Sequence, residues 1–205
     1  ACQAGIMFGD NHDIPAFRWY VKPEGKLYVS GRDAARINAR YARGTGLLRG
    51  GSSINNMMAG DAAKSLLTLA TLQTADPSEQ ERRATDIYLL MLNPYFFLRT
   101  LALYFADVVR EVWEGWRQRA NGVQPRLNRL HNFYPFVRAA TTVLMREVAS
   151  YLAILDIIRG SPSIYVTWPG YDEVAHHAGP WTKDAFRTLR HFDRVVARIR
   201  GVIRR

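Results

Sequence analysis

The strongest constraint on the fold is a pair of long segments with helical periodicity in the middle of the chain. The first runs from about Asn93 to Arg119, where Asn93 suits an N-cap and Pro94 suits the first helical position. The second runs from about Pro135 to Arg159. A turn signal, Asn121-Gly122, lies between them. The two segments therefore predict a helical hairpin of unusual length.

β-structure is predicted on both sides of this hairpin. Residues 163–168, Ser-Ile-Tyr-Val-Thr-Trp, form a compact β-rich run between prolines, which is typical of a buried strand. Near the N-terminus, residues 16–20 and 27–29 are strand-like on either side of a Pro-Glu-Gly-Lys turn. We therefore expect an α/β fold in one domain, residues 1–205, with a helical insertion at residues 86–160.

The remaining segments give shorter patterns. Residues 33–43 predict a basic helix, and residues 65–72 predict a buried strand. Residues 44–61 are rich in Gly, Ser and Asn, which suits a loop whose backbone closely approaches another group. Residues 73–80 are typical of a polar connection. Thr182 to Ile203 predicts an amphipathic helix with an Arg-rich outer face.

Charge and cysteine content restrict the function. The formal net charge is +10, from 28 Lys and Arg against 18 Asp and Glu. Such an excess favours phosphate-bearing partners, which include nucleic acid, anionic lipid and phosphorylated substrates. Cys2 is the only cysteine, which excludes an internal disulfide and a cysteine-rich zinc site.

The apolar run from Ile87 to Leu98 is too short for a membrane span, which takes roughly 20 apolar residues. The predicted helix that follows it is rich in aromatic residues, among them Trp113 and Trp116, and has several arginines toward its far end. Two interpretations are open: a helix lying on an anionic membrane, or a core helix packed on residues 143–158. We favour the core helix.

A cluster of ionisable residues follows the predicted strand at 163–168. Within six residues the sequence places Asp172, Glu173, His176 and His177, and open α/β sheets bind ligands where their strands end. Asp172 and His176 are four residues apart, so that on a helical turn they would share one face. A carboxylate oxygen and an imidazole nitrogen in that arrangement can bind one divalent ion. The alternative is a solvated polar loop, and we favour the metal site.

The pattern Asp172-x-x-x-His176-x-x-Gly179-Pro180 after a strand resembles a metal-binding motif of the alkaline phosphatase superfamily, in the branch of type I phosphodiesterases and nucleotide pyrophosphatases. Residues 4–19, residues 50–62 and the long helical insertion are also similar to bacterial members. The resemblance covers most of the chain, and the motif around Asp172 is its most specific part.

This resemblance implies a metal-dependent hydrolase of phosphoric esters with an alkaline-phosphatase-like sheet and two divalent ions, zinc or manganese. Asp172 and His176 would bind one ion, and His177 is a candidate for outer support of that site. The family's nucleophile would lie upstream of Ala1, and further metal ligands would lie downstream of Arg205. We therefore expect an incomplete catalytic domain that is inactive alone. Relatives of this bacterial branch also make membrane association of the whole protein an expectation.

Other candidate residues have weaker patterns. Ser52 and Ser53 follow two glycines and could form a phosphate loop, although a plain tight loop is the favoured interpretation. Lys64 and Arg49 could steer an anionic substrate, and ordinary surface charge is the favoured alternative. His12 and His131 lack ligand partners nearby in the sequence. They are therefore interpreted as structural or exposed.

Two function classes follow. The first is the metal-dependent phosphodiesterase or phosphatase. The second is a non-catalytic basic helical module that binds anionic membrane or nucleic acid, supported by the net charge and the Arg-rich final helix. We favour the hydrolase with a phosphate-ester substrate, and we do not expect nucleic acid as a partner.

Overall fold

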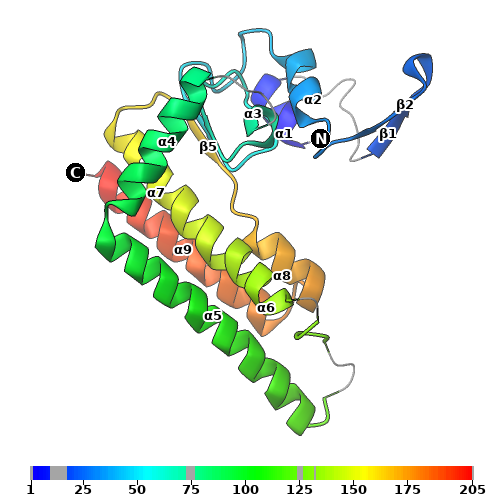
Figure 1. The fold of residues 1–205 in the computed structure, drawn as a ribbon, viewed down its shortest axis with the longest axis vertical. Helices are drawn as coiled ribbons and strands as arrows, with labels where there is room; N and C mark the ends of the chain where they lie inside the picture. The colour runs from blue at the N-terminus through cyan, green and yellow to red at the C-terminus, as the bar shows by residue number, and fades with distance from the viewer. Residues whose placement is uncertain (1, 10–17, 73–76, 124–126, 132, 205) are drawn as a thin grey trace. The chain divides into compact units, whose positions relative to one another are not determined.

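The structure is a computed structural model, and it describes residues 2–9, 18–72, 77–123, 127–131 and 133–204 (Figure 1). The chain divides into two compact units. Unit 1 consists of Ala1–Ile87 and Leu152–Thr167, and unit 2 consists of Tyr88–Tyr151 and Trp168–Arg205. The architecture is mixed α/β, as the sequence predicts.

Unit 1 contains a small parallel sheet. Its central strand is β3, Ser52–Ile54, which pairs with β4, Lys64–Leu66, on one side and with β5, Ile164–Val166, on the other. Three helices of this unit are short: α1 at Cys2–Phe8, α2 at Ala34–Tyr41 and α3 at Leu69–Leu72. A buried cluster of apolar side chains from α1, α2 and the segments around β3 forms the core of unit 1: Met7, Ile37, Tyr41, Leu48 and Met58.

The pairing of β3 with β5 explains one glycine of the Gly-rich stretch. A Cβ atom at Gly51 would lie 2.2 Å from the backbone oxygen of Ser163, a separation that real side chains do not adopt. Ser52 N donates to the same oxygen at 2.8 Å, which begins the ladder between the two strands. The backbone at Gly51 therefore does approach another group closely, and that group is the neighbouring chain segment.

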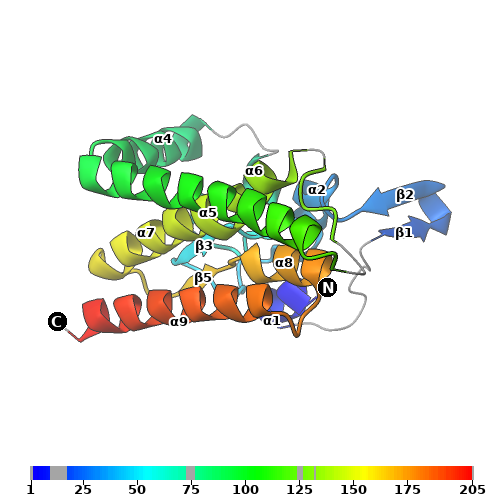
Figure 2. The ribbon, with the colours of Figure 1, turned by 90° about the horizontal axis from the view of Figure 1, so that it is seen from below.

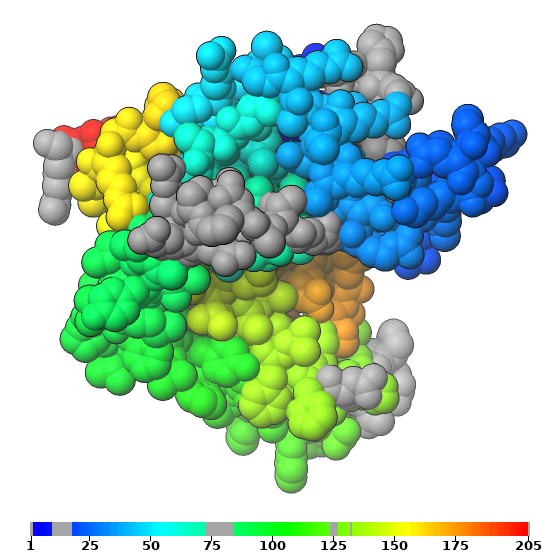
Figure 3. All heavy atoms as spheres, turned by 45° about the horizontal axis from the view of Figure 1, so that its top comes forward, coloured from blue at the N-terminus to red at the C-terminus, as the bar shows by residue number. Residues whose placement is uncertain are grey.

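The N-terminal hairpin follows the predicted pattern. β1, Arg18–Val21, pairs antiparallel with β2, Lys26–Val29, through a 3-10 turn at Lys22–Glu24. Gly25 closes this turn with a φ of 58°, which glycine adopts without steric cost. Trp19 and Tyr28 are opposite each other, and their rings stack at 5.3 Å. In Figure 3 the hairpin, drawn in dark blue, stands out beside the lighter blue surface of α2.

Unit 2 is helical. Its elements are the end of α4 (Pro77–Met91), α5 (Pro94–Ala120), α6 (Tyr134–Ala139), a π-helical segment (Ala140–Leu144), the start of α7 (Met145–Ile158), α8 (Gly170–Ala178) and α9 (Lys183–Ile203). Figure 2 shows α5 and α9 as the two long helices of this unit. Both helices have a side-chain N-cap. The Asn93 side chain accepts a hydrogen bond from the backbone N of Phe96, and the Thr182 side chain accepts one from the backbone N of Ala185.

The interior of unit 2 contains charged groups that are paired. Arg129 lies 2.7 Å from Glu111 and 2.7 Å from Asp184, which ties α5 to α9. Arg138 lies 2.9 Å from Asp107 and 3.1 Å from Glu111, which ties α6 to α5. Because a buried charge without a partner is costly, each ion pair also restricts how these helices can pack.

Among the described residues no single helix is long and apolar enough to cross a membrane. Ala84–Met91 of α4 and Pro94–Ala120 of α5 pass that test together by length and composition, with a bend of 83° at the break between them. The break follows from the sequence, since Pro94 cannot donate the hydrogen bond that would continue α4. The predicted apolar run at 87–98 therefore belongs to two helices.

The structure confirms the two long helical segments, the hairpin, the strand at 163–168 and the final helix. Three of the expectations for segments are wrong in part. Residues 44–61 contain strand β3, and residues 65–72 contain the end of β4 followed by helix α3. Residues 77–80 of the expected polar connection begin helix α4. Residues 16–17 of the predicted N-terminal strand lie outside the described residues, and so do residues 73–76 of the predicted polar connection. Residues 88–151 of the expected insertion at 86–160 lie in unit 2, and both of its ends lie in unit 1.

Candidate metal site

Helix α8 carries the ionisable cluster directly after β5 and the segment Thr167–Pro169. Its first residue, Gly170, lies against the π-helical segment, so that an added Cβ atom would be 2.9 Å from the Cα of Thr142. Thr142 donates its hydroxyl to the backbone oxygen of Arg138 at 2.7 Å, which fixes the segment that α8 contacts. The Pro-Gly pair before the cluster therefore sets where α8 begins within unit 2.

Asp172 and His176 share one face of α8, as their spacing predicts. His176 Nε2 lies 3.4 Å from Asp172 Oδ1, and both side chains are 81% exposed. Neither atom is committed to another side chain of the described residues, and both are open to solvent and to ions. The arrangement offers one carboxylate oxygen and one imidazole nitrogen to a common cation.

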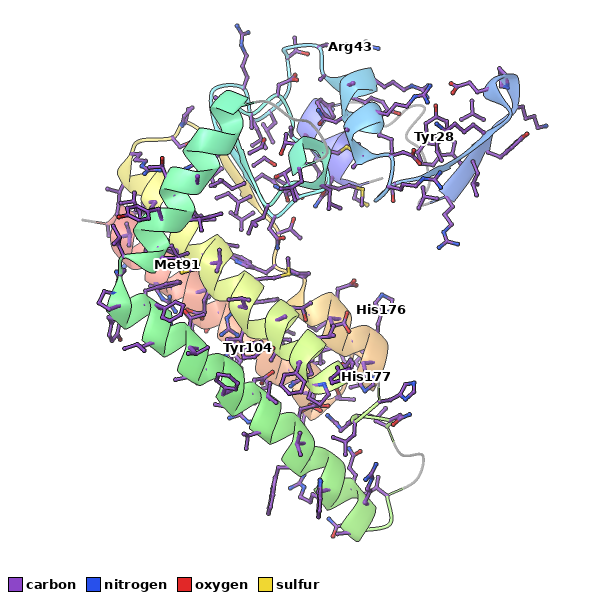
Figure 4. The ribbon with its side chains drawn as sticks, viewed as in Figure 1. Tyr28, Arg43, Met91, Tyr104, His176 and His177 are labelled. Carbon is purple, nitrogen blue, oxygen red and sulfur yellow. The ribbon has the colours of Figure 1, made fainter. Side chains whose placement is uncertain are left out.

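His177 leaves α8 in another direction (Figure 4). Its ring stacks on Tyr134 of α6, with ring centroids 3.8 Å apart, and its buried Nε2 has no hydrogen-bond partner among the residues that the structure describes. Burial lowers the pKa of His177, although the nearby Glu111 carboxylate opposes this shift. His177 therefore supports the packing of α8 on α6, and it does not face the Asp172–His176 pair.

The other acidic and histidine candidates do not join this pair. Glu173 is half-buried on α8. His131 is exposed in the segment before α6, and His12 lies outside the described residues. Within the described part of the chain, His, Cys, Asp and Glu side chains form no group of three or more that could hold a metal ion. Asp172 and His176 thus stand as a pair, with no third side chain of these types beside them in the described part of the chain.

Ser52 and Ser53 are side by side in β3, with exposed fractions of 1% and 0%. The Ser52 hydroxyl lies 2.6 Å from Asp156 Oδ2, and the Ser53 hydroxyl donates to the backbone oxygen of Met58 at 2.9 Å. A phosphate-binding role would require both internal hydrogen bonds to break. We therefore do not include these serines in the candidate site.

Lys64 was a candidate for steering anions, and the structure places it in an internal ion pair. Its Nζ lies 2.5 Å from Asp86 Oδ2 and 2.6 Å from Asp156 Oδ1. Arg159 lies 2.8 Å from the other oxygen of Asp86. The charge of Lys64 is therefore neutralised within unit 1, whereas Arg49 is exposed.

A polar network at the carboxyl ends of β3 and β5 was not predicted. Thr167 donates its hydroxyl to Asn56 Oδ1 at 2.6 Å, and Asn55 Nδ2 donates to the backbone oxygen of Thr167 at 2.8 Å. Gln3 of α1 donates to the Thr167 hydroxyl at 2.9 Å. The sequence signal that could have predicted this network is the pair of consecutive asparagines, Asn55 and Asn56, directly after β3. Because these groups satisfy one another, the network holds α1 to the sheet.

Comparisons of the chain with protein-family models, with curated proteins and with solved structures find no match.

Proposed function

We propose that this protein takes part in the metal-dependent hydrolysis of phosphoric esters, with Asp172 and His176 as two ligands of one divalent ion. The observation that carries the proposal is the distance of 3.4 Å between His176 Nε2 and Asp172 Oδ1 on an exposed helix face. The sequence supports it independently, since the motif around these residues resembles a metal-binding motif of the alkaline phosphatase superfamily.

The distance agrees with coordination geometry. Zinc binds imidazole nitrogen and carboxylate oxygen at about 2.0–2.2 Å, so two ligands of a tetrahedral ion lie about 3.4 Å apart. An ordinary hydrogen bond between these groups would be shorter, at about 2.7–2.9 Å when charged. The pair therefore has the separation of two atoms that contact one ion, without a movement of α8.

Each residue has a defined task in this proposal. Asp172 contributes negative charge, which retains the ion, and His176 contributes a neutral nitrogen ligand. A bound pair of ions would polarise the phosphoryl group and neutralise the attacking and leaving oxygens. Zinc and manganese both suit an oxygen and nitrogen ligand set. No nucleophile is assigned within residues 1–205. As part of the same proposal, the sheet of unit 1 corresponds to part of an alkaline-phosphatase-like sheet.

The rival explanation is a plain i, i+4 ion pair on a solvated helix. Such a pair contributes roughly 0.3–0.5 kcal/mol to helix stability and has no catalytic consequence. The rival class of function, a basic module for nucleic acid, predicts a steep fall of affinity with salt and no effect of Asp172 on binding.

Turnover in the complete protein tests the proposal. We expect hydrolysis of a nitrophenyl phosphodiester in the presence of zinc or manganese, and we expect Asp172→Ala and His176→Ala each to abolish it. His131→Ala is the matched control, because His131 is an exposed histidine of the same unit that is outside the pair. Unchanged turnover in both site variants would rule out the assigned ligands.

A further inference from the structure

Helix α5 exposes a stripe of large apolar side chains. Val109, Trp113 and Trp116 have exposed fractions of 66%, 69% and 65%, and Leu98 and Phe105 extend the same stripe toward the start of the helix. Their spacings of seven, four, four and three residues place all five on one face. In Figure 3 the green side chains of this region lie at the surface. An apolar face of this length is unusual on a surface that contacts water alone.

The opposite face of α5 is polar where it packs. Asp107 and Glu111 point into unit 2, where they pair with Arg138 and Arg129. The helix thus has paired charges among its inward-facing residues and large apolar side chains outside, which departs from the usual pattern of a surface helix. Paired charges on the inner side and apolar side chains on the outer side suit a helix whose outer surroundings are apolar.

A basic cavity of about 250 Å³ borders this helix. It lies between α5, the α6–α7 segment and α9. Its lining contains His191, whose pKa burial lowers, and five arginines: Arg110, Arg138, Arg146, Arg187 and Arg194. Arg138 and Arg146 are buried, whereas Arg110 and Arg194 are exposed. Asp107 is the one carboxylate in the lining, and it is paired with Arg138.

Two of these cations are free to bind an anion. Arg138, Arg146 and Arg187 already contact Asp107, Glu147 and Asp184. Among the described residues neither Arg110 nor Arg194 has an ion-pair partner. Arginine donates two parallel hydrogen bonds to a phosphate group, so the exposed pair at the edge of the cavity suits a phosphate.

An apolar pocket lies at the start of the same helix. It has a volume of about 190 Å³ and is lined by the end of α4, the first turns of α5 and residues of the α7 region. Met91 and Tyr104, both labelled in Figure 4, line it from α4 and α5. The exposed stripe is therefore accompanied by a space that can accept a hydrocarbon group.

We propose that unit 2 docks on an anionic phospholipid bilayer through α5. The apolar stripe enters the boundary between headgroups and acyl chains, a depth of roughly 5–10 Å. A headgroup phosphate lies at the basic cavity between Arg110 and Arg194. The aromatic side chains of the stripe suit this depth, because tryptophan prefers the membrane interface. This inference stands on α5 and its neighbours and does not depend on the metal site.

Charge selects the bilayer over a second copy of the chain. On α5, Asp107 and Glu111 are turned inward, and Glu114 is paired with Arg117 at 3.0 Å. A second copy docking through α5 would therefore bring no unpaired carboxylate of this helix to the free arginines. An anionic lipid surface supplies the missing negative charge throughout the interface.

Vesicle co-sedimentation of the 205-residue chain tests the proposal. We expect binding to vesicles of phosphatidylcholine with phosphatidylglycerol, and weak binding to phosphatidylcholine alone. Trp113→Glu removes an exposed anchor and should lower the partition coefficient at least about tenfold. Circular dichroism should show an unchanged helix content, because Trp113 is exposed in the folded state.

The headgroup site has its own matched pair of variants. Arg110→Glu combined with Arg194→Glu should lower the partition coefficient on anionic vesicles at least about tenfold more than the control variant does. The control, Arg43→Glu combined with Arg200→Glu, changes the net charge equally at exposed arginines outside the cavity. Equal losses in both double variants would contradict a specific headgroup site.

Three other results would overturn the proposal. The first is binding of inorganic phosphate at the cavity without co-sedimentation with either kind of vesicle. The second is a dimer in solution that Trp113→Glu dissociates, since the stripe would then be an interface between copies. The third is co-sedimentation that Trp113→Glu leaves unchanged.

Discussion

The Nζ atom of Lys64 lies 2.6 Å from Oδ1 of Asp156, and the side chain of Asp156 is 3% exposed. The same Nζ atom lies 2.5 Å from Oδ2 of Asp86, which belongs to helix α4. A single lysine thus joins β4, α4 and α7 within unit 1. Removing it would leave two buried carboxylates that share one remaining cation among the described residues, Arg159.

Lys64→Met is therefore expected to destabilise the protein by about 3–5 kcal/mol, because it leaves buried charge without its partner. Urea unfolding monitored by circular dichroism measures this loss. The control is Arg32→Met, which breaks an ion pair with Asp33 in which the arginine side chain is 61% exposed. That loss should be no more than about 1 kcal/mol. Similar losses in the two variants would contradict the buried role of Lys64.

Acid should weaken the interior of unit 2 through Asp184. Burial by itself would raise the pKa of this carboxyl, but the hydrogen bond from Arg129 and the charges of Arg129, Arg138 and Arg187 together outweigh burial and lower the pKa. An unfolded aspartate titrates near about 3.9. The stabilisation by Asp184 is therefore complete above that pH and is lost as the pH falls through the lower value of the folded protein.

Unfolding free energies measured from neutral pH downward test this sign. Asp184→Asn should be less stable than the wild type at neutral pH, and the difference should shrink as the pH falls below about 4. A difference that stays constant with pH would show that the carboxylate charge of Asp184 does not contribute.

Gly51→Ala is expected to disrupt the pairing of β3 with β5. Its Cβ atom would meet the backbone oxygen of Ser163 at 2.2 Å, so one strand must move. We expect a loss of about 3 kcal/mol or more, which is large for a single methyl group. Gly201→Ala is the matched control, since nothing lies within 4 Å of its added Cβ atom and it lies inside helix α9. The control should gain up to about 1 kcal/mol.

Helical periodicity predicted the two longest helices of the fold. The apolar spacing of both helices and the Asn93 cap of α5 placed α5 and α9 within one or two residues of their observed ends. The strands β3 and β4 were harder, because each is three residues long and too short for a period of two to appear. The pairing of β3 with β5 also depends on contacts between residues more than a hundred positions apart, as between Ser52 and Ile164.

The surroundings of side chains were harder to predict than the elements. Trp113 and Trp116 repeat at helical spacing, and the expectation that they belong to a core helix is wrong for both residues, which are exposed. Periodicity shows that a helix has two faces, but it does not show which face packs. Here the inward face was marked by the acids Asp107 and Glu111, whose arginine partners come from distant segments. The pairing of Asp172 with His176, by contrast, followed from their i, i+4 spacing alone.

The most direct test of the metal site is imidazole NMR of the chain during titration with zinc. The chain has five histidines, so the ring of His176 can be assigned by substitution. We expect zinc to shift the His176 Nε2 resonance, and we expect Asp172→Asn to weaken this effect at least about tenfold, or by about 1.4 kcal/mol. The exposed His131 should respond much less and equally in both proteins. A His176 resonance that zinc leaves in place, or a zinc response that Asp172→Asn does not change, would contradict a shared ion at these two residues.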